Sequence, residues 1–193
     1  MTHLNIQNIK EKETLTLTKG QLFGHYGIVP FLLMSPIMTT YSLIQIYLTK
    51  TYTEVRTVEE LMLSGFPWLI PALLLYFIQK KRLKFTTINI SVDKEKFHNA
   101  AKLTADKLGW TIQHSSTDSI IAVRQGGFSS GSWGELITII RDRDKVLINS
   151  ICDPDNIGSI VSYGWNKKNV RIFNATLESL QATSSICKKR ADS

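Results

Sequence analysis

Two uncharged stretches decide the organisation of this chain: YGIVPFLLMSPIMTTYSLIQIYLT at 26–49 and LMLSGFPWLIPALLLYFIQ at 61–79. The basic run KKRLK follows the second stretch at 80–84. About 20 predominantly apolar residues, rising about 1.5 Å each, cross a hydrocarbon core near 30 Å thick. The sequence therefore predicts a transmembrane hairpin at 26–83, with spans at about 26–48 and 61–79.

The charges around the two stretches predict the topology of the hairpin. The connector at 50–60 carries two basic and three acidic residues, whereas Lys80, Lys81, Arg82 and Lys84 are all basic. Basic residues favour the cytoplasmic side, so we expect both termini in the cytoplasm and the connector outside. The alternative is a soluble helical hairpin, but helices that are apolar on every face need more covering protein than this chain supplies. The first 25 residues lack the short apolar core of a cleavable signal peptide.

Polar side chains inside the first span recur at helical spacing, at Ser35, Thr39 and Ser42. Small polar residues on one stripe let a second helix approach closely, so we interpret the stripe as a packing face toward the other span or another copy. A transport pathway is the alternative, although neither span carries the Asp, Glu, Lys or Arg that marks ion routes.

The net charge of +7 lies mostly outside the second half of the chain. Residues 85–183 hold 11 Lys and Arg against 10 Asp and Glu, and the excess lies at 80–84 and in the tail. This distribution favours anionic lipid headgroups over nucleic acid as the partner of the basic residues. We divide the chain into an N-terminal cytosolic segment (1–25), the hairpin (26–83), a cytosolic domain (85–183) and a basic tail (184–193).

The domain is predicted to be α+β, in the order β-α-β-β-β-β-α. Residues 86–92 alternate and are β-branched, as in a strand, and 94–108 shows apolar residues at helical spacing between Asp93 as N-cap and Gly109 as stop. Asn166 is the expected cap of the last helix. One antiparallel sheet with both helices on a single face would bury both apolar stripes. The remaining predicted elements are strands at 111–115, 119–124, 135–142 and 145–152 and a helix at 167–180.

The Gly-rich segment 126–134 is the best candidate site. Its glycines and serines could present N–H and hydroxyl groups to an anion, but it lacks the G-x-x-x-x-G-K-[ST] phosphate-loop pattern, so a plain strand connection is the alternative. Within and beside it, the possible ligand or partner contacts are Arg124, Phe128, Ser130, Trp133 and Glu135.

No catalytic, metal-binding or cofactor-binding pattern is visible elsewhere. The four histidines and two cysteines are not at ligand spacing, and Cys152 within an apolar strand is typical of a small core residue. Asp153 and Asp155 could bind a cation, but turn chemistry explains both. We therefore expect no catalytic residues, metal or cofactor.

The leading hypothesis is a membrane-anchored protein whose cytosolic domain is an interaction or regulatory module, with a protein partner or a second copy as its target. The membrane in this hypothesis is a bacterial inner membrane. Segments SICDP (150–154) and GWNKKN (164–169) resemble bacterial membrane-anchored proteins, but they indicate no family and imply no residue roles. Two alternatives stay open. One is a membrane-bound ligand sensor or enzyme that uses the 126–134 loop, and the other is an oligomeric channel or transporter accessory subunit.

Overall fold

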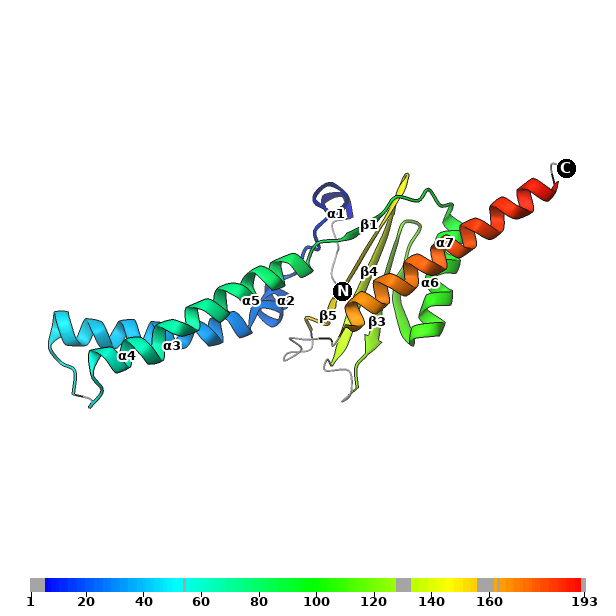
Figure 1. Cartoon of the computed structure of the whole chain (residues 1–193). Helices are drawn as coiled ribbons and strands as arrows, with labels where there is room; N and C mark the ends of the chain where they lie inside the picture. The colour runs from blue at the N-terminus through cyan, green and yellow to red at the C-terminus, as the bar shows by residue number, and fades with distance from the viewer. Residues whose placement is uncertain (1–5, 54, 128–132, 156–161, 163, 192–193) are drawn as a thin grey trace. The chain divides into compact units, whose positions relative to one another are not determined.

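The computed structural model describes residues 6–53, 55–127, 133–155, 162 and 164–191, with side chains up to residue 182. Two compact units emerge, which we call the sheet domain (Met1–Gly24 with Arg82–Ser193) and the helical hairpin (His25–Lys81). Figure 1 shows the course of the chain through both. The sheet domain is built from segments on both sides of the hairpin, so residues far apart in sequence share one core.

The sheet domain is α+β with a five-stranded antiparallel sheet in the order β1-β5-β4-β3-β2. The predicted order β-α-β-β-β-β-α is confirmed, and helices α6 and α7 lie on one face of the sheet (Figure 1). The elements from β1 onward are β1 (Thr86–Ile88), α6 (Lys94–Leu108), β2 (Trp110–Ser115), β3 (Ser119–Gln125), β4 (Gly134–Asp142), β5 (Lys145–Cys152) and α7 (Trp165–Ala191).

Local signals set several of these boundaries. The Asp93 side chain accepts a 2.8 Å hydrogen bond from the Lys96 N–H, and Gly109 ends α6 at a φ of 70°. Both features pair backbone N–H or carbonyl groups that would otherwise lack a hydrogen bond at the helix ends. The predicted cap at Asn166 is wrong, because α7 begins at Trp165 and the Asn166 N–H donates to Ser162 Oγ at 3.4 Å.

The first strand is shorter than predicted. Residues 86–92 alternate like a strand, but only Thr86–Ile88 pair with β5. Ile88 lies opposite Val146, one residue from the start of β5 at Lys145, so the partner strand ends there. Ile90 and Val92 still pack against the core.

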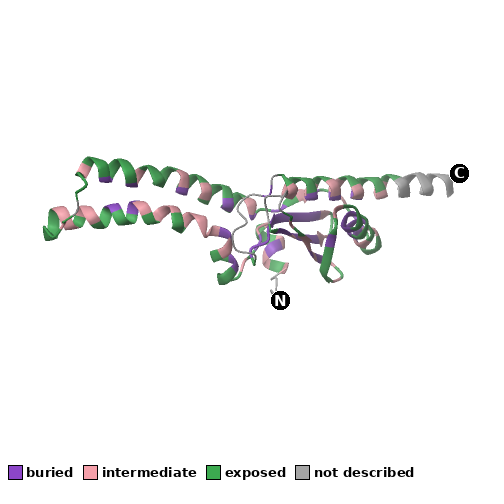
Figure 2. Cartoon of the chain, turned by 90° about the horizontal axis from the view of Figure 1, so that it is seen from below, coloured by how far each residue is buried: buried purple, intermediate pink, exposed green. Residues whose placement is uncertain are grey.

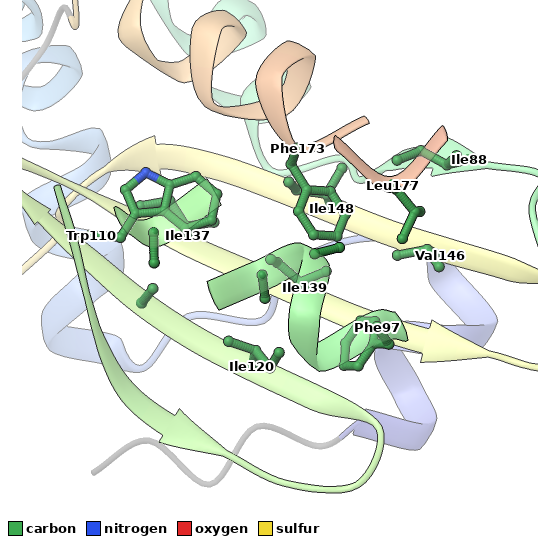
Figure 3. Close-up of a cluster of buried hydrophobic side chains, with 14 of the residues drawn as sticks. Ile88, Phe97, Trp110, Ile120, Ile137, Ile139, Val146, Ile148, Phe173 and Leu177 are labelled. Atoms are coloured by element: carbon green, nitrogen blue, oxygen red, sulfur yellow. The ribbon is translucent and has the colours of Figure 1, made fainter. Parts of the chain in front are cut away.

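The main core lies between the sheet and the two helices. Figure 3 shows Phe97 of α6 and Phe173 and Leu177 of α7 gathered in one cluster with Ile137 and Ile139 of β4. All five side chains are fully buried. Because side chains alternate along a strand, the residues between them on β4 and β5 face the other side of the sheet.

The N-terminal segment packs with that second face. Helix α1 (Ile6–Lys12) buries Ile9 completely, and the next residues run antiparallel to the chain before β1. The Leu15 N–H donates to the Leu83 carbonyl and the Phe85 N–H to the Glu13 carbonyl, each at 2.8 Å. The sheet is therefore covered on both faces, although the sequence predicted cover on only one.

The helical hairpin is formed by α3 (Ile28–Ile44) with a π-helical turn (Gln45–Thr49), then α4 (Val58–Gly65), a 3-10 turn (Phe66–Trp68) and α5 (Leu69–Arg82), which reaches one residue into the sheet domain. Two continuous helices, Ile28–Thr49 and Val58–Arg82, are long and apolar enough to cross a membrane. Their side chains are mostly exposed, whereas buried residues concentrate in the sheet (Figure 2).

The small polar stripe of the first helix packs against the second. Ser35 and Thr39 donate at 3.4 Å to the carbonyls of Ser64 and Leu61. A Cβ atom at Gly65 would overlap the Thr39 hydroxyl, so glycine permits the close approach of the two helices. The predicted packing role of this stripe is confirmed for these two residues.

Candidate functional site

A row of chemically distinctive side chains crosses four strands at one end of the sheet. In the strand register, Trp110 of β2 lies opposite Arg124 of β3, Arg124 opposite Glu135 of β4, and Glu135 opposite Cys152 of β5. Directly opposed residues point to the same face of an antiparallel sheet. This row lies on the same face of the sheet as the core. We call these four residues, together with Trp165, Asn166, Lys168 and Asn169 of α7, the Trp165 cluster.

A buried ion pair forms the centre of the Trp165 cluster. Arg124 Nη1 lies 2.7 Å from Glu135 Oε2, and the Glu135 side chain is fully buried while that of Arg124 is 13% exposed. Removing a carboxylate from water is costly, so this pair depends on its short charge-assisted hydrogen bond. Two candidate residues from the sequence, Arg124 and Glu135, are thus in direct contact.

The first residue of α7 covers the guanidinium. The Arg124 Cζ atom lies 3.4 Å from the centroid of the Trp165 ring, and Lys168 Nζ lies 4.0 Å from the same centroid. Cations near an aromatic face are attracted by its negative potential, and more strongly where water is excluded. The contact joins the first residue of α7 to the last residues of β3 and, through Glu135, to the first residues of β4.

A hydrogen-bonded chain extends the cluster toward the core. The Trp110 Nε1–H donates to Asn169 Oδ1 at 3.2 Å, and Asn169 Nδ2 donates to Ser150 Oγ at 3.0 Å. Ser150 in turn donates to Asn166 Oδ1 at 3.1 Å. Because Asn169 is fully buried, these bonds satisfy polar atoms that would otherwise be left unpaired away from water.

Cys152 is the cluster's only thiol among the described side chains, and it is buried as predicted. Burial raises its pKa above the ordinary value, while the nearby Arg82 charge and a hydrogen bond with Asn166 act in the opposite direction. The thiol is therefore protonated at neutral pH, and a protonated thiol is a poor nucleophile and metal ligand.

His98, one of the four histidines, and the pair Asp153 and Asp155 have structural contacts. His98 bonds to the carbonyls of Lys94 and Ser116 at 2.7 and 3.0 Å. The Asp155 N–H donates to Asp153 Oδ1 at 3.1 Å, as in an Asx turn. Across the described side chains, no three His, Cys, Asp or Glu residues gather as metal ligands would.

The Gly-rich segment presents an aromatic ring to solvent. Trp133 is 69% exposed, and it directly precedes Gly134, whose φ of 151° and close approach to the Arg124 carbonyl both require glycine. The predicted contacts at Phe128 and Ser130 fall outside the described residues. Trp133 is therefore two residues from Glu135 in the chain, and its ring is not part of the core.

The basic residues after the second span differ from one another. Lys80, Lys81 and Lys84 are exposed, as a lipid-surface role would require. Arg82 is half-buried, and its carbonyl, like that of Lys84, accepts from Asn149 Nδ2, at 2.9 and 2.8 Å. No pattern in the sequence indicates this link to β5.

Sequence reasoning missed the α7 half of the Trp165 cluster, including Asn166 and Asn169. The GWNKKN segment was the available signal, since it places Trp165, Asn166 and Asn169 within five positions, but a single sequence does not show which strand ends they meet. Comparisons with protein-family models, curated proteins and solved structures find no match to this chain. Support for a function therefore comes from the sequence and geometry of this chain alone.

Proposed function

We propose that this chain is a two-pass integral membrane protein whose sheet domain is an interaction or regulatory module on the cytoplasmic side of a bacterial inner membrane. The pairing of residues 13–15 with residues 83–85 carries this proposal. The two hydrogen bonds between these segments and the 2.6 Å contact of Glu13 with Lys145 make the flanks of the hairpin parts of one domain.

That pairing restricts the path of the chain through a bilayer. A chain that enters the membrane after residue 24 must return to the same side by residue 82, because the segments before and after fold together. Two spans satisfy this condition and one span does not. The two helices that are long and apolar enough to cross, at 28–49 and 58–82, supply that number.

The charges favour the cytoplasm as the side that holds the sheet domain. Four basic residues lie at 80–84, whereas the connector at 50–60 has two basic and three acidic residues. The positive-inside rule places the richer basic segment in the cytoplasm, where anionic headgroups also attract exposed lysines.

An interaction role is supported by Trp133. A large aromatic side chain that is 69% exposed has the character of an anchor for a partner, since tryptophan is enriched among residues that dominate binding energy. Arg124 and Glu135, the residues that a ligand sensor would use, bond to each other beneath Trp165. Because these two residues bond to each other, we infer that they stabilise the surface around Trp133 and do not contact a ligand.

Cysteine labelling tests the anchor and the topology together. Thr53 in the connector and Asp144 in the β4–β5 turn are both exposed, so each is replaced by cysteine in a background without Cys152 and Cys187. A membrane-impermeant maleimide should label position 53 on intact cells and position 144 only after lysis. Labelling at 144 on intact cells, or recovery of the protein in the supernatant after carbonate extraction, would overturn the proposal.

A further inference from the structure

Helix α2 (Lys19–Tyr26) has its polar side toward protein and its apolar side toward the outside. Gln21 and His25, one helical turn apart, are 6% and 8% exposed. Leu22 and Phe23 on the other side are 39% and 68% exposed. A surface helix of a soluble domain shows the reverse arrangement, with its apolar stripe toward the core.

The two ends of the polar side of α2 have different partners: Gln21 and Gly24 contact the sheet domain, whereas His25 Nε2 lies 3.1 Å from the Gln79 carbonyl oxygen within the hairpin. Thr18 and Gln21 form a reciprocal pair at the start of the helix, with the Gln21 N–H donating to Thr18 Oγ1 and the Thr18 N–H to Gln21 Oε1. Gln21 Nε2 also donates to Asp155 Oδ2 at 3.1 Å. A Cβ atom at Gly24 would lie 2.3 Å from the Pro154 carbonyl oxygen, so the helix backbone packs directly on the turn after β5.

The outward side of α2 forms a stripe at helical spacing. Lys19, Leu22 and Phe23 lie at i, i+3 and i+4, which places them on one face. Tyr26, at i+7, continues the spacing but packs against Tyr76, with ring centroids 5.6 Å apart. The stripe begins with an exposed lysine, and Gly27 separates α2 from the apolar helix that begins at Ile28. Lysine and aromatic residues are the side chains that favour the boundary between headgroups and acyl chains.

We propose that the α2 stripe binds the lipid surface, with Leu22 and Phe23 inserted below the headgroups and Lys19 among the phosphates. This inference rests on the proposed membrane anchor and adds a second contact to it. The continuity of the stripe with the first span and the positive charge at its start both favour an anionic bilayer as its occupant.

The consequence is a second attachment of the sheet domain to lipid. Because Gln21 and Gly24 join α2 to the turn at Asp153–Asp155, insertion of the stripe adds a lipid contact to the domain itself, beside the two spans.

Spin labelling of the full-length protein in vesicles of phosphatidylcholine and phosphatidylglycerol tests this inference. A nitroxide is attached at Phe23→Cys, with Gly20→Cys on the same helix as the aqueous control, since a side chain there meets no other atom within 4 Å. Phe31→Cys, which is 67% exposed on α3, serves as the lipid reference. We expect positions 23 and 31 to be more accessible to oxygen than to a nickel chelate, and position 20 to show the opposite.

The outcomes separate this inference from the anchor on which it rests. Nickel accessibility at position 23 equal to that at position 20, with position 31 still shielded, would overturn lipid binding by α2 and leave the anchor intact. Nickel accessibility at position 31 would overturn both. Dipolar broadening between labels at position 23 would place a second copy of the chain on the stripe and would also overturn the inference.

Discussion

The buried pair Arg124–Glu135 allows the sharpest test of the Trp165 cluster. Replacing Arg124 by methionine keeps an unbranched side chain but removes the positive charge that lies 2.7 Å from the fully buried Glu135 carboxylate. Breaking a buried pair in this way costs about 3 to 5 kcal/mol, and the stacking on Trp165 is lost with it. Since domains have about 5 to 15 kcal/mol of stability, Arg124→Met should fold but unfold at a temperature lower by about 10 °C.

The double variant shows whether charge is the cause. Arg124→Met combined with Glu135→Leu removes both charges and replaces them with apolar side chains, which is often neutral or stabilising for a buried pair. We expect it to recover most of the stability lost in Arg124→Met. Glu135→Leu alone should cost less than Arg124→Met, because the arginine side chain is partly exposed and keeps its contact with Trp165.

Unfolding of the full-length variants in detergent micelles, followed by tryptophan fluorescence, measures these differences: heating gives the unfolding temperature and urea gives the free energy of unfolding. Arg141→Met is the control for a more exposed pair, since Arg141 is 24% exposed and pairs at 2.6 Å with Asp118, which is 43% exposed, although Arg141 also donates to the Val92 carbonyl at 3.3 Å. An exposed pair contributes about 1 kcal/mol or less. If Arg124→Met lost no more stability than Arg141→Met, or if the double variant were as unstable as the single one, the pair would not stabilise the domain as argued.

Two further predictions concern the N-terminal segment and Trp133. Hydrogen bonds from Lys145 and Thr87 hold the pKa of Glu13 below its ordinary value. The Glu13 carboxylate therefore stabilises the fold fully above the unfolded-state pKa of about 4.3, and this stabilisation is lost as the pH falls through the lower pKa of the folded state. Glu13→Gln should therefore flatten the acid limb of stability against pH, and an unchanged limb would count against the contact. Trp133→Ala should change the free energy of unfolding by no more than about 0.5 kcal/mol because the ring is exposed, whereas a photo-crosslinker at position 133, but not at Lys102, should capture a protein partner in cells. A loss of several kcal/mol, or equal crosslinking at both positions, would contradict the interaction role.

Local chemistry made much of the sheet domain predictable. The cap at Asp93, the stop at Gly109 and the turn between β4 and β5 depend on neighbouring residues, and the strands from β2 to β5 match their predicted ranges to within one residue. The length of β1 depended instead on where β5 begins, 57 positions further along the chain from Ile88 to Lys145. Alternation within 86–92 contains no information about that distance.

The candidate site was likewise predictable only where it depends on residues close in sequence. Arg124 and Glu135 were found because they flank the Gly-rich segment, which brings its two ends together as adjacent strands. Their cover by Trp165 depends on how α7 packs across the sheet, and no short pattern records such packing. The pairing of Glu13 with Phe85 is of the same kind, since it joins segments separated by the whole hairpin.

That separation bears on how the domain and the hairpin depend on each other. A flexible loop as long as His25–Lys81 would cost about 3 to 4 kcal/mol of entropy to close. The packing of two antiparallel helices already brings the two ends of the hairpin close together. The contacts of Ser35 and Thr39 with the second helix stabilise this packing. The hairpin therefore lowers the entropic cost of joining residues 13–15 to 83–85. The domain in turn keeps the two ends of the hairpin close together. A fragment that begins at Phe85 would lack Ile9, Leu15 and the cover they give to the second face of the sheet, so we expect the stable form of the domain to require residues 6–24 as well as those after the hairpin.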